Sequence, residues 1–203
     1  MNASTTVWLI RHAATENMEG RCYGWHDVPL SQDGIGQAES LAKRLARSRL
    51  SAVYASPLRR ALETARILAA PHDVSVETIQ GLAEIHFGDF EGLSYEEIQA
   101  RFPETYQRWM DQPTAVRFPN GEDFHTLQRR ALAAISSILA RNVGNSIAVV
   151  THAGIVRILL ADALGIPDSH IFRLAQDYAA INRIDYDDHG ATVKVVNGYK
   201  EEG

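Results

Sequence analysis

The chain has 203 residues, 45% of them hydrophobic, and is long enough to bury a substantial core as one domain. Its formal net charge of -5 is spread along the sequence without a run of like charges, which argues against a nucleic-acid partner. Cys22 is the single cysteine, which favours a reducing compartment, so we expect a cytoplasmic protein. The apolar run at residues 7–10 is too short for a signal peptide or a membrane span, so we expect no membrane partner.

The first part of the chain alternates strand and helix patterns. Residues 6–11 begin as a continuous apolar run, which predicts a strand buried on both faces. Residues 33–48 carry apolar side chains at helical spacing and predict an amphipathic crossover helix. Residues 52–55 predict a second strand, and residues 58–70 predict a helix that begins after a Ser-Pro pair. This order is typical of a parallel sheet with helices packed on it.

The last part of the chain continues the alternation. Residues 147–151 predict a buried strand, followed by a helix at about 154–164 that Gly165 closes. Residues 179–186 and 191–197 predict two strands joined by a turn-rich connection. We therefore predict an α/β fold, a three-layer α/β/α sandwich whose sheet is mostly parallel with an antiparallel edge strand.

Residues 80–125 interrupt this alternation with many glycines and prolines. They contain two short helical patterns, at about 94–102 and 104–111, and a long helix is predicted from about 122–141. In α/β proteins such excursions commonly cover the site at the carboxyl ends of the strands. We expect residues 1–203 to form a single domain with a capping insertion at about 80–125, and substrate selectivity to lie in that insertion.

Basic side chains stand at the ends of three predicted strands. Arg11 and His12 end the first strand, Arg60 follows the second, and His152 ends the third. Open α/β sheets bind ligands at this edge. Two histidines and at least two arginines brought together there make a cationic, donor-rich pocket of the kind that a phosphoryl group requires.

His12 is the candidate nucleophile. Neighbouring strand residues point to opposite faces, so Arg11 and His12 can share a site only where the strand ends. A neutral imidazole can attack phosphorus directly, which divides one hard displacement into two easier ones. Arg11, Arg60 and His152 can neutralise the phosphoryl oxygens, as Mg²⁺ does in many enzymes. Since common metal-ligand spacings are absent from the sequence, we predict no metal and no cofactor.

Ordinary explanations exist for several of these residues. An Arg-His pair is weak evidence alone, and one of Arg59 and Arg60 is expected to be a solvated surface group. Trp25 and Trp109 fit either core packing or substrate contact. The leaving oxygen needs a proton, which a carboxylic acid such as Glu84 can supply. On chemistry alone Glu84 has rivals, namely Glu91, Glu96, Glu97 and Glu122.

The motifs, taken in order, resemble those of the histidine phosphatase superfamily, also called phosphoglycerate-mutase-like. They cover nearly the whole chain: Leu9-Ile10-Arg11-His12, Asn17, Gly24 with residues 27–31, Ser56-Pro57-Leu58-Arg59-Arg60-Ala61, Leu82-Ala83-Glu84, Glu91-Gly92, residues 119–122 and Thr151-His152-Ala153-Gly154. The resemblance implies a phosphoglycerate-mutase-like fold, Glu84 as the general acid, and His12, Arg11, Arg60 and His152 as the other catalytic residues. It also implies substrate binding by Asn17, Gly24 and Ala153.

Departures from the family pattern bear on the reaction. Ala13 and Ala14 replace the signature's glycine and glutamate, and the spacing to Asn17 is one residue shorter than in the mutases. Residues 20–31 are similar to a phosphatase branch that includes the α-ribazole phosphatases of cobalamin synthesis. We therefore predict a phosphomonoesterase acting on a small phosphorylated metabolite, with α-ribazole 5'-phosphate as a refinement. A phosphoglycerate-mutase-type isomerase, a non-catalytic phospho-ligand binding protein and a homodimer stay open.

Overall fold

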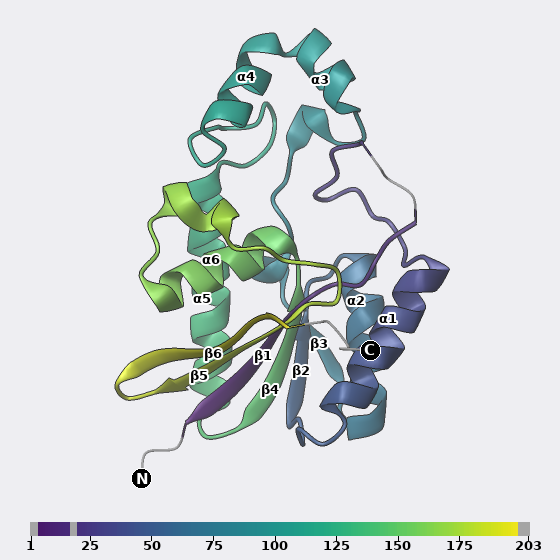
Figure 1. Cartoon of the computed structure of the whole chain (residues 1–203), viewed down its shortest axis with the longest axis vertical. Helices are drawn as coiled ribbons and strands as arrows, with labels where there is room; N and C mark the ends of the chain where they lie inside the picture. Colours follow the sequence, from purple (N-terminus) through teal and green to yellow (C-terminus); the bar gives the residue numbers. More distant parts are fainter. Residues whose placement is uncertain (1–3, 17–19, 199–203) are drawn as a thin grey trace.

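A six-stranded sheet in the order β3-β2-β4-β1-β5-β6 forms the centre of the computed structural model, which describes residues 4–16 and 20–198 (Figure 1). The neighbours from β3 to β1 pair in parallel, whereas β5 and β6 are antiparallel. The mostly parallel sheet is confirmed, and its antiparallel edge is a hairpin of two strands. The strands are β1 Thr5–Arg11, β2 Ala52–Ala55, β3 Val76–Thr78, β4 Ser146–Thr151, β5 Ile181–Asp187 and β6 Gly190–Gly198.

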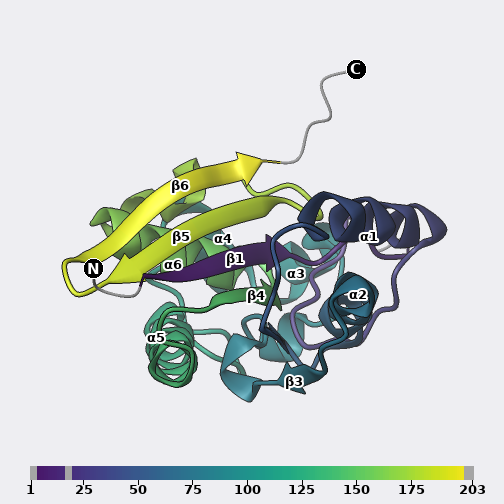
Figure 2. The ribbon, with the colours of Figure 1, turned by 90° about the horizontal axis from the view of Figure 1, so that it is seen from below.

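Helices cover both faces of the sheet. One face packs against α1 Gln32–Leu45 and α2 Arg59–Ala69, and the other packs against α5 Phe124–Arg141 and α6 Ala153–Leu164 (Figure 2). Successive β1 residues enter different cores: Leu9 joins the α5–α6 cluster and Ile10 joins the α1–α2 cluster. Because both faces are covered, the strands read as continuous apolar runs. The predicted three-layer sandwich is confirmed.

Local sequence signals set the helix boundaries close to their predicted positions. Ser31 caps α1 by accepting a hydrogen bond from the Gly34 N–H, and Asp123 caps α5 by accepting from the Thr126 N–H. Gly165 ends α6 with a φ of 65°, a left-handed conformation that glycine adopts without strain. Among the described residues, no helix is both long and apolar enough to cross a bilayer.

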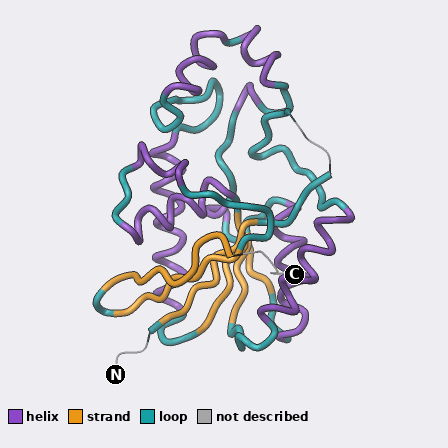
Figure 3. Tube along the Cα trace, viewed as in Figure 1, coloured by secondary structure: helices purple, strands orange, loops and turns teal. Residues whose placement is uncertain are grey.

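Within residues 80–125, the part from 85 to 118 leaves the sheet and packs around apolar residues together with Cys22, whereas Leu82 and Phe124 join the main core. Residues 85–118 form α3 Tyr95–Arg101 and α4 Pro103–Asp111, close to the two predicted helical patterns. Figures 1 and 3 show these helices beyond the loops that follow the carboxyl ends of the strands. Phe90 and Phe118 are buried at the centre of this separate cluster, and Trp109 packs against them. The segment thus has a small core away from the main sheet.

Candidate active site

A cavity of about 290 Å³ lies at the carboxyl end of β1 and collects most of the predicted site residues. Its wall includes five of them: Arg11, His12, Arg60, Glu84 and Ala153. His152 adjoins this group, because its ring centroid lies 5.1 Å from that of His12. The sequence separations among these residues are large, so the end of the parallel sheet is what brings them together.

His12 is buried and neutral. Burial, with the positive charges of Arg60 and Arg11, holds its pKa well below the usual range. The Nδ1 atom lies 2.8 Å from the Ala13 carbonyl oxygen, which can only accept, so Nδ1 carries the proton. The lone pair is therefore on Nε2, as nucleophilic attack requires. The backbone is fixed as well, because the His12 N–H donates to the Thr151 carbonyl at 2.8 Å.

His152 stands at the N-cap position of α6 and is fully buried. Burial, followed by the charge of Arg60, holds its pKa well below the usual range. The Ser56 hydroxyl accepts from the Leu58 N–H and lies 2.7 Å from His152 Nε2, so its own hydrogen is available to that nitrogen. With Nε2 accepting, the proton of the neutral ring is on Nδ1, which is buried and has no partner among the described residues.

The two arginines are oriented by main-chain carbonyls. Arg60, 1% exposed, donates from Nη2 to the Gly24 carbonyl at 2.6 Å and from Nη1 to the His26 carbonyl at 3.1 Å. Arg11 donates to the Gln176 carbonyl at 2.6 Å. These acceptors are uncharged, and in each guanidinium the buried Nε has no partner within the described residues. Together with His152 Nδ1, three buried donors are ready for an anion.

Glu84 lies in the loop that follows a short 3-10 turn, Gln80–Leu82. Its Oε1 accepts from the Ile85 N–H at 2.9 Å, and its Oε2 accepts from the Gly154 N–H at 3.1 Å. A Cβ at position 154 would collide with this carboxylate, so a side chain there would have to displace Glu84. The contact joins the start of α6 to the Glu84 loop and fixes the carboxylate at the cavity wall.

Glu91, predicted from the sequence as a rival acid and as part of a family motif but given no structural role, holds the loop beside Arg60. Its carboxylate accepts four backbone N–H bonds of 2.9–3.0 Å, from Gly24, Trp25, His26 and Phe87. The first three belong to the loop whose carbonyls orient Arg60. The sequence signal for Glu91 was the Glu91-Gly92 match to the family motif. The hydrogen-bond partners of Glu91 are main-chain atoms, and no sequence pattern reveals contacts of this kind.

Arg130, which sequence analysis missed, supports the Glu84 loop from α5. It donates to the carbonyl oxygens of Gly81, Ala83 and Glu84 and pairs with both carboxylate oxygens of Glu122 at 2.8 and 2.9 Å. Both side chains of this pair are less than one-fifth exposed. Arg130 is therefore a positioning residue for the loop that carries Glu84.

Gly24 and Asn17 were both assigned to substrate binding. Gly24 does not line the cavity, since its N–H donates to Glu91 and its carbonyl accepts from Arg60. Asn17 lies outside the described residues. Of the arginine pair on α2, Arg59 is the surface member and forms an exposed ion pair with Glu63 at 2.7 Å.

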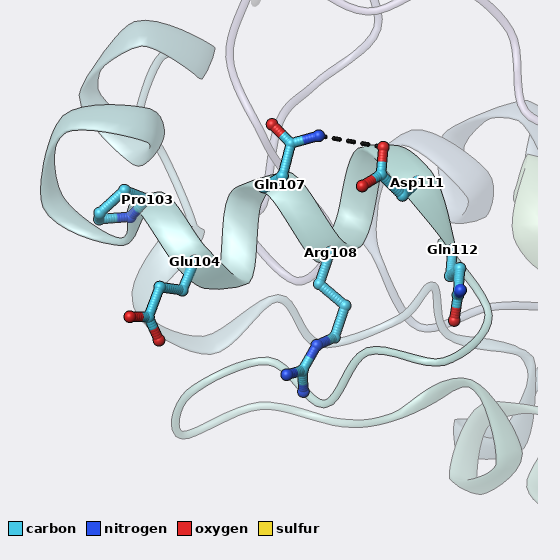
Figure 4. A pocket seen from close by; sticks show the side chains of 6 residues that line it. All are labelled: Pro103, Glu104, Gln107, Arg108, Asp111 and Gln112. Atoms are coloured by element: carbon cyan, nitrogen blue, oxygen red, sulfur yellow. Dashed lines mark hydrogen bonds between the residues drawn. The ribbon is translucent and has the colours of Figure 1, made fainter.

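A larger hollow of about 570 Å³ runs along α4, and its lining includes none of the predicted site residues (Figure 4). Its polar groups are side chains of one helix and its end, including a hydrogen bond of 3.0 Å from Gln107 to Asp111. Across the described ranges, no three His, Cys, Asp or Glu side chains are grouped so that they could hold a metal ion.

Comparison with known proteins identifies the family. The model of the histidine phosphatase superfamily (branch 1) matches residues 7–198. Phosphoserine phosphatase 1 of Hydrogenobacter thermophilus is 30% identical over 190 residues, covering 93% of this chain and 90% of the relative. Adenosylcobalamin/alpha-ribazole phosphatase of Salmonella typhimurium is 33% identical over 193 residues, covering 94% and 95%.

Solved structures agree in fold along nearly the full length. Bacillus stearothermophilus YhfR superposes with a TM-score of 0.90 at 34% identity, covering 97% of this chain and 98% of the other. The alpha-ribazole phosphatase from Shigella flexneri gives 0.89 at 29% identity, covering 98% and 100%. The chain therefore belongs to branch 1 of the histidine phosphatase superfamily and is a hydrolase of the phosphatase class.

Proposed function

We propose that this protein is a phosphomonoesterase that hydrolyses the phosphate ester of a small metabolite through a phosphohistidine on His12. The observation that supports this most strongly is the set of buried, unpartnered donors, Arg11 Nε, Arg60 Nε and His152 Nδ1, at a neutral His12. Together they can bind the phosphoryl oxygens and stabilise their charge during transfer.

In the first step, the Nε2 lone pair of His12 attacks phosphorus and the bond to the ester oxygen breaks. Glu84, in its protonated form, gives its proton to that oxygen, which leaves as a neutral alcohol. The phosphoryl group is then bonded to Nε2, while Nδ1–H keeps its hydrogen bond to the Ala13 carbonyl.

In the second step, water attacks the phosphohistidine. The Glu84 carboxylate takes a proton from the water as the new P–O bond forms and the P–N bond breaks. His12 returns to its neutral form, inorganic phosphate leaves, and Glu84 is protonated for the next cycle. The residues assigned to both steps lie at one cavity, and the chemistry needs no metal ion.

The names of the relatives offer two substrates, phosphoserine and α-ribazole phosphate. We infer that residues 80–125 cap the site and select the leaving group, because Phe87, Tyr95 and Trp109 from this segment line the cavity. The similarity of residues 20–31 to the α-ribazole phosphatase branch makes α-ribazole 5'-phosphate the first metabolite to test.

A phosphate-release screen in the presence of EDTA tests the proposal. The panel contains α-ribazole 5'-phosphate, phosphoserine, 3-phosphoglycerate, sugar phosphates and nucleotides. His12→Ala should lose about 10³-fold or more of the wild-type turnover, whereas His189→Ala, at an exposed turn, should keep it. Wild-type turnover by His12→Ala would overturn the mechanism. Formation of 2-phosphoglycerate from 3-phosphoglycerate faster than hydrolysis would instead make the enzyme a mutase.

A further inference from the structure

A second cavity, of about 150 Å³, adjoins the active site and is mostly apolar. Glu84, Phe87, Trp109 and Ala153 line both cavities, so the two lie side by side. We propose that this apolar cavity binds the leaving group, an inference that rests on the proposed function. The preferred substrates are then phosphate esters of alcohols that carry an aromatic or similarly apolar group.

The position of Glu84 indicates that the leaving group binds in this cavity. In-line displacement puts the leaving oxygen on the side of phosphorus away from His12 Nε2. Glu84 must reach that oxygen to protonate it, so the rest of the alcohol extends past Glu84. The cavity that shares Glu84 but is not lined by Arg11 or Arg60 is the apolar one.

The walls of the apolar cavity suit a flat ring. Phe87 and Trp109 each meet Phe118 edge to face, with ring centroids 4.8 and 5.4 Å apart. From α5, Phe124 and Leu127 add buried apolar surface. Aromatic side chains held in this way offer both faces and edges to an aromatic ligand, in addition to the apolar area that they bury.

The same walls are poorly suited to an amino-acid leaving group. Among the described residues lining this cavity, the charged side chains are Glu84 and Arg157. An ammonium group would therefore have Glu84 as its only acidic partner, and pairing with it would compete with proton transfer. Burial of an unpaired charge is costly, so phosphoserine should be the weaker substrate. Arg157 already donates to the Leu174 carbonyl and lies over the Phe172 ring at 5.6 Å.

Phe172 is the residue best suited to testing this cavity. It lies in the turn Asp168–Arg173, lines the apolar cavity and is 52% exposed, so its truncation removes wall area at little cost to folding. Leu164, at the end of α6, is a matched control, because it is 46% exposed and lines neither cavity.

The experiment measures kcat/KM for ethyl phosphate, 2-phenylethyl phosphate, 2-(2-naphthyl)ethyl phosphate and O-phospho-L-serine. The first three are esters of primary alcohols with similar leaving-group chemistry, so their differences report on the apolar tail. Wild type should prefer the aromatic esters to ethyl phosphate by about tenfold or more. Phe172→Ala should lower this ratio about fivefold, with the loss mainly in KM, and Leu164→Ala should leave the ratio unchanged.

Three outcomes overturn the inference: a wild-type ratio near one, a ratio that Phe172→Ala leaves intact, or a preference for phosphoserine over the aromatic esters. In each of these cases, hydrolysis of ethyl phosphate that is lost in His12→Ala leaves the proposed function standing. An enzyme that hydrolyses neither these esters nor any phosphate of the metabolite panel would contradict the proposed function itself, so the two failures are distinguishable.

Discussion

The backbone N–H of Gly154 donates to Oε2 of Glu84 at 3.1 Å, and the carboxylate occupies the space where a side chain at position 154 would begin. The Glu84 carboxylate thus contacts the backbone of Gly154, and this contact joins the Glu84 loop to the start of α6. The proposed general acid has its position fixed by a helix that begins about 70 residues later in the chain.

Gly154→Ala should displace Glu84 and impair proton transfer. We expect kcat/KM for alkyl phosphates to fall about 100-fold or more, since general acid catalysis contributes factors of this size. The first step with p-nitrophenyl phosphate should be affected less, because its leaving group needs no proton, so a burst of p-nitrophenol should precede slow turnover. Gly36→Ala, at an exposed α1 position with open space around it, is the control and should keep wild-type kinetics. Equal losses with both substrates would contradict the assignment of Glu84.

Glu91→Gln should weaken phosphate binding. An amide offers one acceptor oxygen, and its NH₂ group would face backbone N–H donors that the carboxylate now satisfies. The loop at residues 24–26 should loosen, and Arg60 should lose its fixed orientation. We expect the inhibition constant of inorganic phosphate to rise about tenfold and the free energy of unfolding to fall by about 2 kcal/mol. Glu104→Gln, an exposed change on α4, should alter neither, and an unchanged inhibition constant in Glu91→Gln would refute this role.

The site residues at the strand ends are predictable from the sequence, whereas the residues that hold them in place are not. Arg11, His12 and His152 were predictable because buried strands are visible as apolar runs and parallel strands share one carboxyl edge. Glu91 and Arg130 act on main-chain atoms of segments far from them in sequence, and such contacts leave no periodic pattern. The strand β3 was not predicted, since its three residues include only one that is partly buried.

Arg130→Met should destabilise the Glu84 loop. The change removes three hydrogen bonds to loop carbonyls and leaves Glu122 without its ion-pair partner in a mostly buried site. We expect the free energy of unfolding, measured by urea denaturation, to fall by about 3 kcal/mol, and kcat to fall with it. The neighbouring Arg129→Met is exposed and should have little effect. A loss below about 1 kcal/mol in Arg130→Met would show that the loop is held by other contacts.

The two buried histidines should make stability depend on pH just below about 6.5. Burial lowers the pKa of His12 and His152 well below the value of about 6.5 expected in the unfolded chain, so only the unfolded state takes up protons in this window. The contribution of the two histidines to the free energy of unfolding is therefore fully present above about pH 6.5. The free energy of unfolding falls as the pH decreases below this value, by up to about 1.4 kcal/mol per pH unit for each histidine.

Urea denaturation across this pH range measures the slope. His12→Asn keeps a donor for the Ala13 carbonyl but cannot take up a proton, so its slope should be about half that of wild type. His189→Asn, at an exposed turn, should keep the wild-type slope. A His12→Asn slope equal to that of wild type would mean that His12 is protonated in the folded protein, against the neutral nucleophile described above.

The most direct test of the mechanism is rapid-quench labelling with a ³²P-labelled phosphomonoester that the enzyme hydrolyses. Wild type should carry acid-labile, alkali-stable label within a single turnover, and peptide mapping should place it on His12. With ³²P-labelled p-nitrophenyl phosphate, whose leaving group needs no proton, Gly154→Ala should accumulate more of this label, because hydrolysis of the phosphohistidine still needs Glu84. A labelled residue other than His12, or turnover by wild type without any trapped label while His12→Ala stays active, would contradict the phosphohistidine mechanism.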